Sequence, residues 1–319
     1  MPTRVLAFHS FCRPVLTAFL FVLAGAAVAK DGLSEAMQDW ADRHAMHPFV
    51  LVALDADGQI VAQVATGDAG ERPLPLASIS KTIAGQCVLH AVASGMIGFE
   101  TTTGEVLDWP EPQGAITVAQ LLTHASGLGP DATQTDIMGL NLTDPHRIAA
   151  IVDGLADRPL QNPVHAYNNE NYLVLEAMMW TVLGEDPVEW CLQSAPALAA
   201  YDSFAPNDRT FALGFAGGLE ASAADLARFF QVLTVAEEWP RTPMGGPNEY
   251  GPGIIIQEID IGTNLFHAGG LCLVTGMGFG SFAGQLANGA SIAVMYSGCA
   301  QEKPLREMNA LIIEHLATP

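Results

Sequence analysis

The alternation of apolar and polar residues predicts strands near both ends of the chain. Phe49–Leu54 is continuously apolar, and Ile60–Val64 follows it after an Asp-Gly turn, a pattern typical of a β-hairpin. Strand character returns near the C-terminus in Gly253–Ile259, Leu271–Phe282 and Ala290–Tyr296. The two ends of the chain therefore supply the strands of one predicted sheet.

Helical periodicity occupies the rest of the chain. Amphipathic helices are predicted over residues 33–45, Ser222–Val235 and Glu302–Leu316, and the stretch from Ser78 to about Ala205 consists of helices broken by loops. The order predicts an α/β (α+β) fold: a five-stranded antiparallel sheet built from both termini, flanked by helices, with an inserted all-helical lobe. We assign residues 30–77 and 206–319 to the α/β lobe and 78–205 to the helical lobe.

The first 29 residues have the pattern of a secretory signal peptide. Arg4 and Arg13 give a positive start, Pro14–Ala29 is apolar, and Ala27-Val28-Ala29 is a small-x-small cleavage site. The alternative is an uncleaved anchor, but this apolar stretch is shorter than the ~20 residues that span a bilayer. We therefore expect cleavage after residue 29, a periplasmic or secreted protein, and no membrane association afterwards.

Charge and composition narrow the function classes. The formal net charge is −21, and removal of residues 1–29 makes it about −23, which argues against nucleic acid and anionic membrane surfaces as partners. The cysteines and histidines have no metal-ligand spacing, so we expect no metal or other cofactor. The apolar half of the sequence suffices for a large core. The oligomeric state cannot be predicted from these features.

Lys81 is the most informative single residue. The chain has only three lysines, and Lys30 and Lys303 lie in polar terminal stretches, whereas Lys81 lies in the apolar run Leu74–Leu89. Burial of an ammonium group costs several kcal/mol unless the group is paired or loses its proton. Ser78 lies three residues earlier, on the same face of a helix. A hydroxyl beside a desolvated amine is the arrangement that activates a serine nucleophile.

Further motifs follow Ser78-x-x-Lys81 in a fixed order. They are Leu121-Leu122-Thr123-His124-Ala125-Ser126-Gly127-Leu128, Tyr167-Asn168-Asn169, a Gly217-Gly218-Leu219 stretch leading to Asp225-Leu226-Ala227-Arg228, and His267-Ala268-Gly269-Gly270. With these motifs the chain resembles the penicillin-recognising serine hydrolases of the class C β-lactamase type, which include D-alanyl-D-alanine carboxypeptidases and related esterases. The resemblance covers essentially the whole mature chain and implies a β-lactamase/transpeptidase-like fold with the active site between the lobes.

The resemblance also implies roles for individual residues. Ser78 would be the nucleophile, with its own N–H and that of Gly270 as oxyanion donors. Either Lys81 or Tyr167 would be the acylation base, and the sequence leaves that choice open. Asn169 would bridge Lys81 and the substrate amide.

The third motif is expected to bind substrate through His267 and Gly269. His267 replaces the lysine of class C β-lactamases and, with an ordinary pKa near ~6.5, would be only partly charged, which disfavours efficient β-lactam hydrolysis. We interpret His124 and Ser126 as structural residues that hold a loop by hydrogen bonds, and Cys87 as a small buried apolar residue.

The predicted function is hydrolysis of a small-molecule or peptide substrate through an acyl-enzyme. The leading substrate class is D-alanyl peptides or amides, as for a carboxypeptidase, or β-lactams, and the alternative is a carboxylesterase acting on small esters. An alternative of another class is a non-catalytic binding module on the same fold.

Cys272 and Cys299 are candidates for a disulfide. Cys272 opens the strand after the His267 motif and Cys299 closes the next one, so hairpin pairing would bring them together in an oxidising compartment. The alternative is two small buried thiols, because a shift of one residue in register would place them on opposite faces.

Overall fold

The computed structural model describes residues 32–67, 69–70, 72–131, 133, 142–272 and 278–317. The expected signal peptide, residues 1–29, lies outside the described residues. In the described part of the chain, no helix is both long enough and apolar enough to cross a bilayer.

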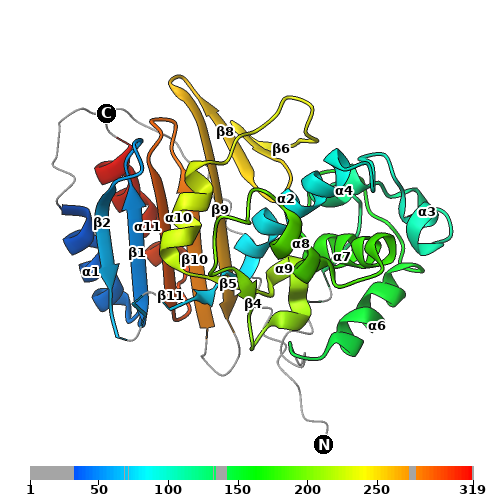
Figure 1. The fold of residues 1–319 in the computed structure, drawn as a ribbon, viewed down its shortest axis with the longest axis horizontal. Coiled ribbons are helices and arrows are strands. Elements are labelled where there is room, and N and C mark those ends of the chain that lie inside the picture. The colour runs from blue at the N-terminus through cyan, green and yellow to red at the C-terminus, as the bar shows by residue number, and fades with distance from the viewer. Residues whose placement is uncertain are drawn as a thin grey trace, which may run out of the picture.

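A large antiparallel sheet forms the centre of the molecule (Figure 1). Its eight strands lie in the order β2-β1-β11-β10-β9-β8-β7-β6. Their bounds are β1 Phe49–Leu54, β2 Ile60–Ala65, β6 Thr242–Gly245, β7 Asn248–Tyr250, β8 Ile255–Ile259, β9 Gly262–Cys272, β10 Gly278–Gln285 and β11 Ser291–Ser297. Strands from the two ends of the chain meet where β1 pairs with β11, with Val52 opposite Ala293.

The expectation of five strands was wrong in its count. The glycine-rich stretch 271–282, read as one strand, contains the end of β9 and the start of β10. The sequence analysis also missed β6 and β7, which have four and three residues and a mixed polar composition that gives no alternating pattern. The predicted strands at 49–54, 60–64, 253–259 and 290–296 agree with β1, β2, β8 and β11 to within two residues.

Alternation along β1 shows how the sheet separates two hydrophobic cores. Phe49, Leu51 and Ala53 belong to the core shared with helices α1 (Leu33–His44) and α11 (Glu302–Leu316). Val50, Val52 and Leu54 project from the other face into the larger core, which includes helix α10 (Ala223–Gln231) and the helical region. Each buried side chain of this kind contributes about 1.5–3 kcal/mol.

The helical region lies beside the sheet (Figure 1). Its helices are α2 Ser80–Ala93, α3 Thr103–Leu107, α4 Val118–Leu122, α6 Pro145–Leu155, α7 Asn169–Leu183, α8 Pro187–Ser194 and α9 Gly214–Gly217, and α10 (Ala223–Gln231) covers the sheet. A small second sheet has the order β3 (Leu74–Pro75), β5 (Leu219–Ala221), β4 (Ala205–Pro206). Short 3-10 helices are η2 Ala77–Ile79, η3 Gln113–Ala115 and η4 Phe211–Leu213.

Helix α2 packs tightly against the segment that connects β7 to β8. Gly85 faces the carbonyl of Pro252, and Gly253, at φ 71°, faces the carbonyl of Lys81 so closely that a Cβ at either position would overlap the backbone. The Thr82 hydroxyl donates a hydrogen bond of 2.6 Å to Gly253 O. These contacts fix the helix that carries the candidate catalytic lysine against the sheet.

Candidate active site

Ser78 lies in the 3-10 turn η2, immediately before α2 begins. The preceding residue, Ala77, has a left-handed φ of 48°, which a non-glycine residue adopts only under strain. Leu76 O accepts a hydrogen bond of 2.6 Å from the Ser281 hydroxyl of β10, and Gly269 packs directly against the same carbonyl. The strained turn that presents Ser78 is therefore fixed to the large sheet.

Lys81 is completely buried and makes three polar contacts. Its Nζ donates to Asn169 Oδ1 at 2.7 Å and to Ala216 O at 2.6 Å, and lies 3.4 Å from Ser78 Oγ. Burial lowers the pKa of Lys81 to about 7, and the negative charge of Asp131 partly opposes that decrease. Near neutral pH the amine is therefore close to half protonated.

Tyr167 lies on the other side of the lysine. Lys81 Nζ is 5.1 Å from the centre of the Tyr167 ring. The Tyr167 hydroxyl is buried, and no described residue lies in hydrogen-bonding geometry to it. Burial raises the pKa of the Tyr167 phenol well above its ordinary value, while the nearby Ser78 hydroxyl acts in the opposite direction. The phenol consequently keeps its proton at neutral pH.

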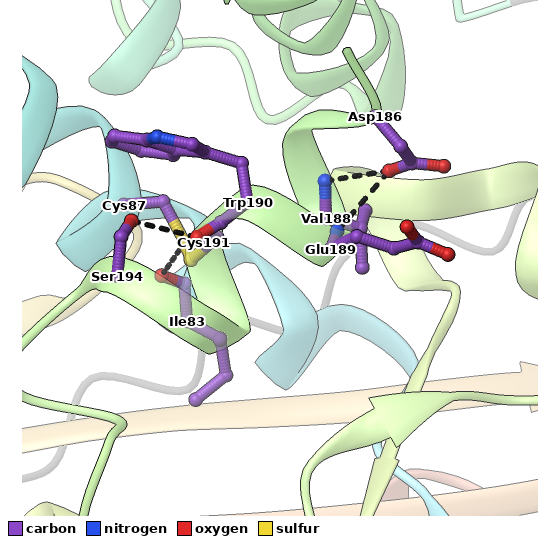
Figure 2. The surroundings of a disulfide bond; sticks show 8 residues. All are labelled: Ile83, Cys87, Asp186, Val188, Glu189, Trp190, Cys191 and Ser194. Carbon is purple, nitrogen blue, oxygen red and sulfur yellow. Dashed lines mark hydrogen bonds between the residues drawn. A yellow bond between two sulfur atoms is a disulfide. The ribbon is translucent and has the colours of Figure 1, made fainter.

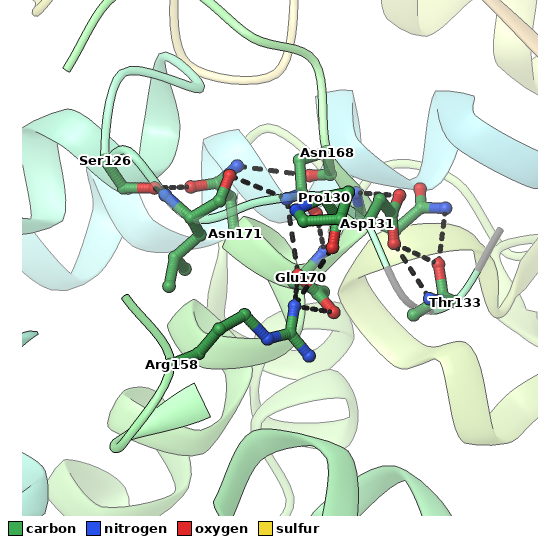
Figure 3. Close-up of polar contacts among 10 residues, drawn as sticks. Ser126, Pro130, Asp131, Thr133, Arg158, Asn168, Glu170 and Asn171 are labelled. Carbon is green, nitrogen blue, oxygen red and sulfur yellow. Dashed lines mark hydrogen bonds and ion pairs between the residues drawn. The ribbon is translucent and has the colours of Figure 1, made fainter. Parts of the chain in front are cut away.

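Asn169 begins helix α7 and links the lysine to Thr133 and Asp131, which Figure 3 labels. Its Nδ2 donates to Thr133 Oγ1 at 3.0 Å, and its backbone N–H donates to Asp131 Oδ2 at 2.9 Å. The expected contact between Asn169 and Lys81 is present. The NH₂ group of Asn169 contacts Thr133 in this structure. Asp131 and Thr133 were not predicted as site residues, because they follow the Leu121–Leu128 motif and belong to no motif of their own.

His124 and Ser126 hold the segment that carries Tyr167. His124 O accepts from Ala166 N at 2.8 Å, and His124 Nδ1 accepts from Asn168 N at 3.3 Å. The rings of His124 and Tyr167 are 4.4 Å apart between centroids. These contacts agree with the structural role expected for His124, and burial keeps the imidazole neutral by lowering its pKa well below the ordinary value.

The same segment is fixed from the helix side (Figure 3). Ser126 Oγ donates to Asn171 Oδ1 at 2.5 Å. The Arg158 guanidinium donates to both carboxylate oxygens of the buried Glu170, at 2.8 and 2.7 Å. Asn168 caps α7 by accepting from Glu170 N at 2.7 Å. A buried polar network therefore sets the position of Tyr167 and Asn169.

The expectation that His267 is partly charged was wrong. Burial, followed by the charge of Lys81, lowers its pKa to about 3, because the imidazole lies 3% exposed between two fixed partners. Its Nδ1 is 2.8 Å from Ala268 O and must donate to it, so Nε2, 2.9 Å from the Tyr250 hydroxyl, accepts from that hydroxyl. The sequence analysis did not anticipate Tyr250, which lies on the unpredicted strand β7.

The two glycines of the third motif differ in their surroundings. A Cβ on Gly269 would overlap Leu76 O and Ser281 Oγ, so this glycine permits the close approach of β9 to the turn before Ser78. A Cβ on Gly270 would meet no atom within 4 Å. Gly270 therefore lies beside open space on the strand that passes the nucleophile turn.

The disulfide of the described residues joins Cys87 of α2 to Cys191 of α8 (Figure 2). Their Cα atoms are 5.3 Å apart. The interpretation of Cys87 as a simple apolar residue was therefore wrong. Helix α8 is placed for this bond by Asp186, which caps it by accepting from Val188 N at 2.8 Å.

The expected bond between Cys272 and Cys299 is not formed. Gly278 of β10 pairs with Cys272, and Gly278 O accepts from Gly298 N at 2.8 Å. Strand β10 thus lies between the segments that carry the two cysteines. The sequence had suggested that these two segments pair directly as a hairpin. In the described residues there is also no group of three or more histidine, cysteine or acidic side chains arranged to hold a metal ion.

Comparisons with known proteins relate this chain to a protein family and to several solved structures. Residues 43–193 match the family model described as Beta-lactamase, and no curated protein matches the chain. The fold resembles D-amino acid amidase from Ochrobactrum anthropi SV3 complexed with L-phenylalanine (14% identity, 90% of this chain and 99% of that one, TM-score 0.70). It also resembles D-alanine carboxypeptidase AmpC from Burkholderia cenocepacia (15%, 90% and 99%, TM-score 0.68) and D-stereospecific amidohydrolase from Streptomyces sp. (19%, 90% and 99%, TM-score 0.66). At these identities the likeness is one of fold.

Proposed function

We propose that this chain, which belongs to the β-lactamase family of penicillin-recognising serine hydrolases, hydrolyses amides that lack a carboxylate through an acyl-enzyme on Ser78. The observation that carries the proposal is the set of partners around Lys81. A neutral amine has two N–H donors and one lone pair. Asn169 Oδ1 and Ala216 O can only accept, so they take both donors, and the lone pair is left for the Ser78 hydroxyl.

Acylation then follows from these positions. The lone pair of Lys81 takes the Ser78 proton as Oγ attacks the carbonyl carbon, and the N–H groups of Ser78 and Gly270 stabilise the oxyanion. The protonated Tyr167 phenol donates to the departing amine, and Lys81 returns its proton to the phenol. In deacylation a water molecule attacks the ester, loses a proton to Lys81, and Ser78 Oγ regains a proton as the acid leaves.

The electrostatics of the site favour a substrate without a carboxylate. His267 is neutral at ordinary pH, and Lys81, whose amine can carry positive charge there, is engaged by Asn169 and Ala216. A terminal carboxylate of a peptide or a β-lactam would enter without a fixed counter-charge. We therefore favour an amide of a D-amino acid, the substrate class in the name of the similar D-amino acid amidase, over a carboxypeptidase or β-lactamase substrate.

A small ester is the second candidate. The same neutral site accepts it, and an alkoxide leaving group needs less help from Tyr167 than an amine does. The D-configuration of the acyl group and the class of leaving group are tested by comparing D- and L-phenylalanine amides with the matching methyl esters.

Intact-mass measurement tests the acyl-enzyme itself. We expect a fluorophosphonate to add one covalent group to the wild type and none to Ser78→Ala, while penicillin labels slowly or not at all. Rapid stoichiometric labelling by penicillin would contradict the preference for substrates without a carboxylate. Absence of labelling by both reagents would instead support the non-catalytic binding module.

We further propose export of the protein to the periplasm or the medium. The pattern of residues 1–29 supports export, and the Cys87–Cys191 disulfide suits an oxidising compartment. N-terminal sequencing of the mature protein is expected to begin at Lys30, and recovery of an intact Met1 from cells would contradict the proposal.

A further inference from the structure

Three hydrogen bonds run in one direction from Lys81 to a carboxylate, and Figure 3 labels the last two residues, Thr133 and Asp131. Lys81 Nζ donates to Asn169 Oδ1 at 2.7 Å, and Asn169 Nδ2 donates to Thr133 Oγ1 at 3.0 Å. The Thr133 hydroxyl donates to Asp131 Oδ1 at 2.7 Å. Thr133 is completely buried, so its hydroxyl does not exchange these partners for water.

The carboxylate determines the direction of the whole series. An ionised carboxylate only accepts, so the single proton of the Thr133 hydroxyl is committed to Asp131. Thr133 Oγ1 must then accept, and the group of Asn169 that faces it must be the NH₂. The amide oxygen is thereby turned towards Lys81. Replacement of Asp131 or Thr133 would remove this constraint on the orientation of the Asn169 amide.

Asp131 also accepts hydrogen bonds from the backbone of Asn169 and of Thr133, the two middle residues of this series. Its Oδ2 accepts from Asn169 N at 2.9 Å, and its Oδ1 accepts from Thr133 N at 3.0 Å. One side chain thus fixes the first residue of α7, the threonine and the amide between threonine and lysine.

We propose that Asp131, acting through Thr133 and Asn169, is a positioning residue that orients the amide on Lys81 and holds a negative charge near the catalytic amine. The proposal rests on the proposed function, in which neutral Lys81 takes the Ser78 proton. It assigns Asp131 no contact with the substrate.

The other titratable groups around Lys81 carry no charge that could replace that of Asp131. The groups that face the amine are His124, His267, Tyr167, Tyr172 and Asp131. Burial lowers the pKa of both histidines and raises the pKa of both tyrosines, so all four are neutral near pH 7. The charge of Asp131 raises the lysine pKa against the larger effect of burial.

The pH dependence of kcat/KM for an uncharged amide tests the proposal. If neutral Lys81 is the base, activity of the wild type rises with pH through the lysine pKa. Asp131→Asn removes the charge that favours the ammonium form, so this acidic limb is expected to move to lower pH by roughly one unit. Thr133→Val is expected to lower kcat with little change in KM, and Thr133→Ser to restore it.

The controls separate positioning from loss of structure. Asp144→Asn removes the same charge from a carboxylate that caps α6 by accepting from His146 N, and it is expected to leave the limb in place. Thermal unfolding identifies variants that are merely unstable. If Asp131→Asn folds poorly, the kcat-against-KM result for Thr133→Val and Thr133→Ser decides.

Two results would overturn the proposal. One is an acidic limb that stays in place in a folded Asp131→Asn, and the other is a loss in Thr133→Val that serine does not restore. Failure of the proposed function is distinguishable, because it would appear as fluorophosphonate labelling that persists in Ser78→Ala or is absent from the wild type.

Discussion

At the scale of single residues, the reactivity of Ser78 depends on how few partners remain for it. Two carbonyl oxygens occupy the N–H donors of neutral Lys81, and the Tyr167 hydroxyl is buried without another full hydrogen bond. An enclosed site of this kind strengthens each remaining polar contact, because little water competes for it. Truncation of any one of the three side chains should therefore act on chemistry before it acts on stability.

Replacement of the three residues gives the first prediction. Ser78→Ala is expected to abolish acylation, and Lys81→Ala and Tyr167→Phe to reduce it by ~10²–10⁴-fold each, because each removes a proton-transfer group. Rates of fluorophosphonate labelling measure the effect, with far-UV circular dichroism as the control for folding. A Ser78→Ala protein that still gained the mass of an acyl group would refute the assignment.

The neutral state of His267 gives a second prediction. Because its pKa is lowered to about 3, the preference of the wild type between a neutral amide and its carboxylate-bearing analogue should not change between pH 5 and pH 8 through this residue. The ratio of kcat/KM for the two substrates measures it. A preference for the anion that rises as pH falls through about 6.5, and that disappears in His267→Gln, would mean that the imidazole is charged after all.

Single residues also show what the sequence could and could not predict at the site. Lys81 stood out because a chain poor in lysine kept one in an apolar run, and burial there is independent of the distant parts of the fold. Asp131, Thr133 and Tyr250 did not stand out, since their importance comes from contacts across loops and strands. His267 was recognised as a motif residue, but its charge state depends on Tyr250, and no local pattern connects the two.

At the scale of elements, α2 is held on two sides. Gly85 and Gly253 permit its contact with the β7–β8 connection, and Cys87 bonds it to α8. The sequence predicted strands and helices with strong periodicity, such as α1, α10 and α11. It did not predict short β6 and β7, because strands of three or four residues acquire their pairing from neighbours and not from their own alternation.

The disulfide gives a third prediction. It closes a loop with a sequence separation of 104, so its loss is expected to cost about 5 kcal/mol in the chain-entropy model. Urea unfolding of the Cys87→Ala/Cys191→Ala double variant against the wild type measures the difference. A linked peptide pair containing Cys87 and Cys191 should appear in a non-reducing digest. An unchanged unfolding midpoint together with the absence of that peptide would contradict the bond.

At the scale of the whole molecule, buried titratable groups make stability depend on pH in two opposite ways. The folded pKa of His267 is below its ordinary value, so its contribution is complete above about 6.5 and is lost as pH falls towards about 3. Burial raises the pKa of Glu176 to about 8, so its contribution is complete below its ordinary value of 4.5 and is lost as pH rises through about 8. The two windows overlap between pH 4.5 and pH 6.5, where the opposite slopes cancel, so the summed contribution of these two groups is greatest there.

A fourth prediction follows from the acidic side of that balance. His267→Gln is expected to flatten the stability loss between pH 6.5 and pH 3, which for wild-type His267 is on the order of 4 kcal/mol. The free energy of unfolding at pH 7 and pH 4 measures it in both proteins. Equal slopes for the two would show that the imidazole does not hold its lowered pKa. Glu176→Gln serves as the opposite control, with its gain over the wild type developing as pH rises from 4.5 to about 8.

The pairing of β1 with β11 also has a consequence for the order in which the chain is made. Val52 lies opposite Ala293, so the central strands of the sheet cannot meet until nearly the whole polypeptide has been synthesised. Until then β1 has only β2 as a neighbour in the sheet, and both hydrophobic cores lack the side chains that β11 contributes. An emerging chain therefore cannot complete either core before β11 is made, and we expect a chain that stops before Ser291 to be a target for proteases instead of a weaker hydrolase.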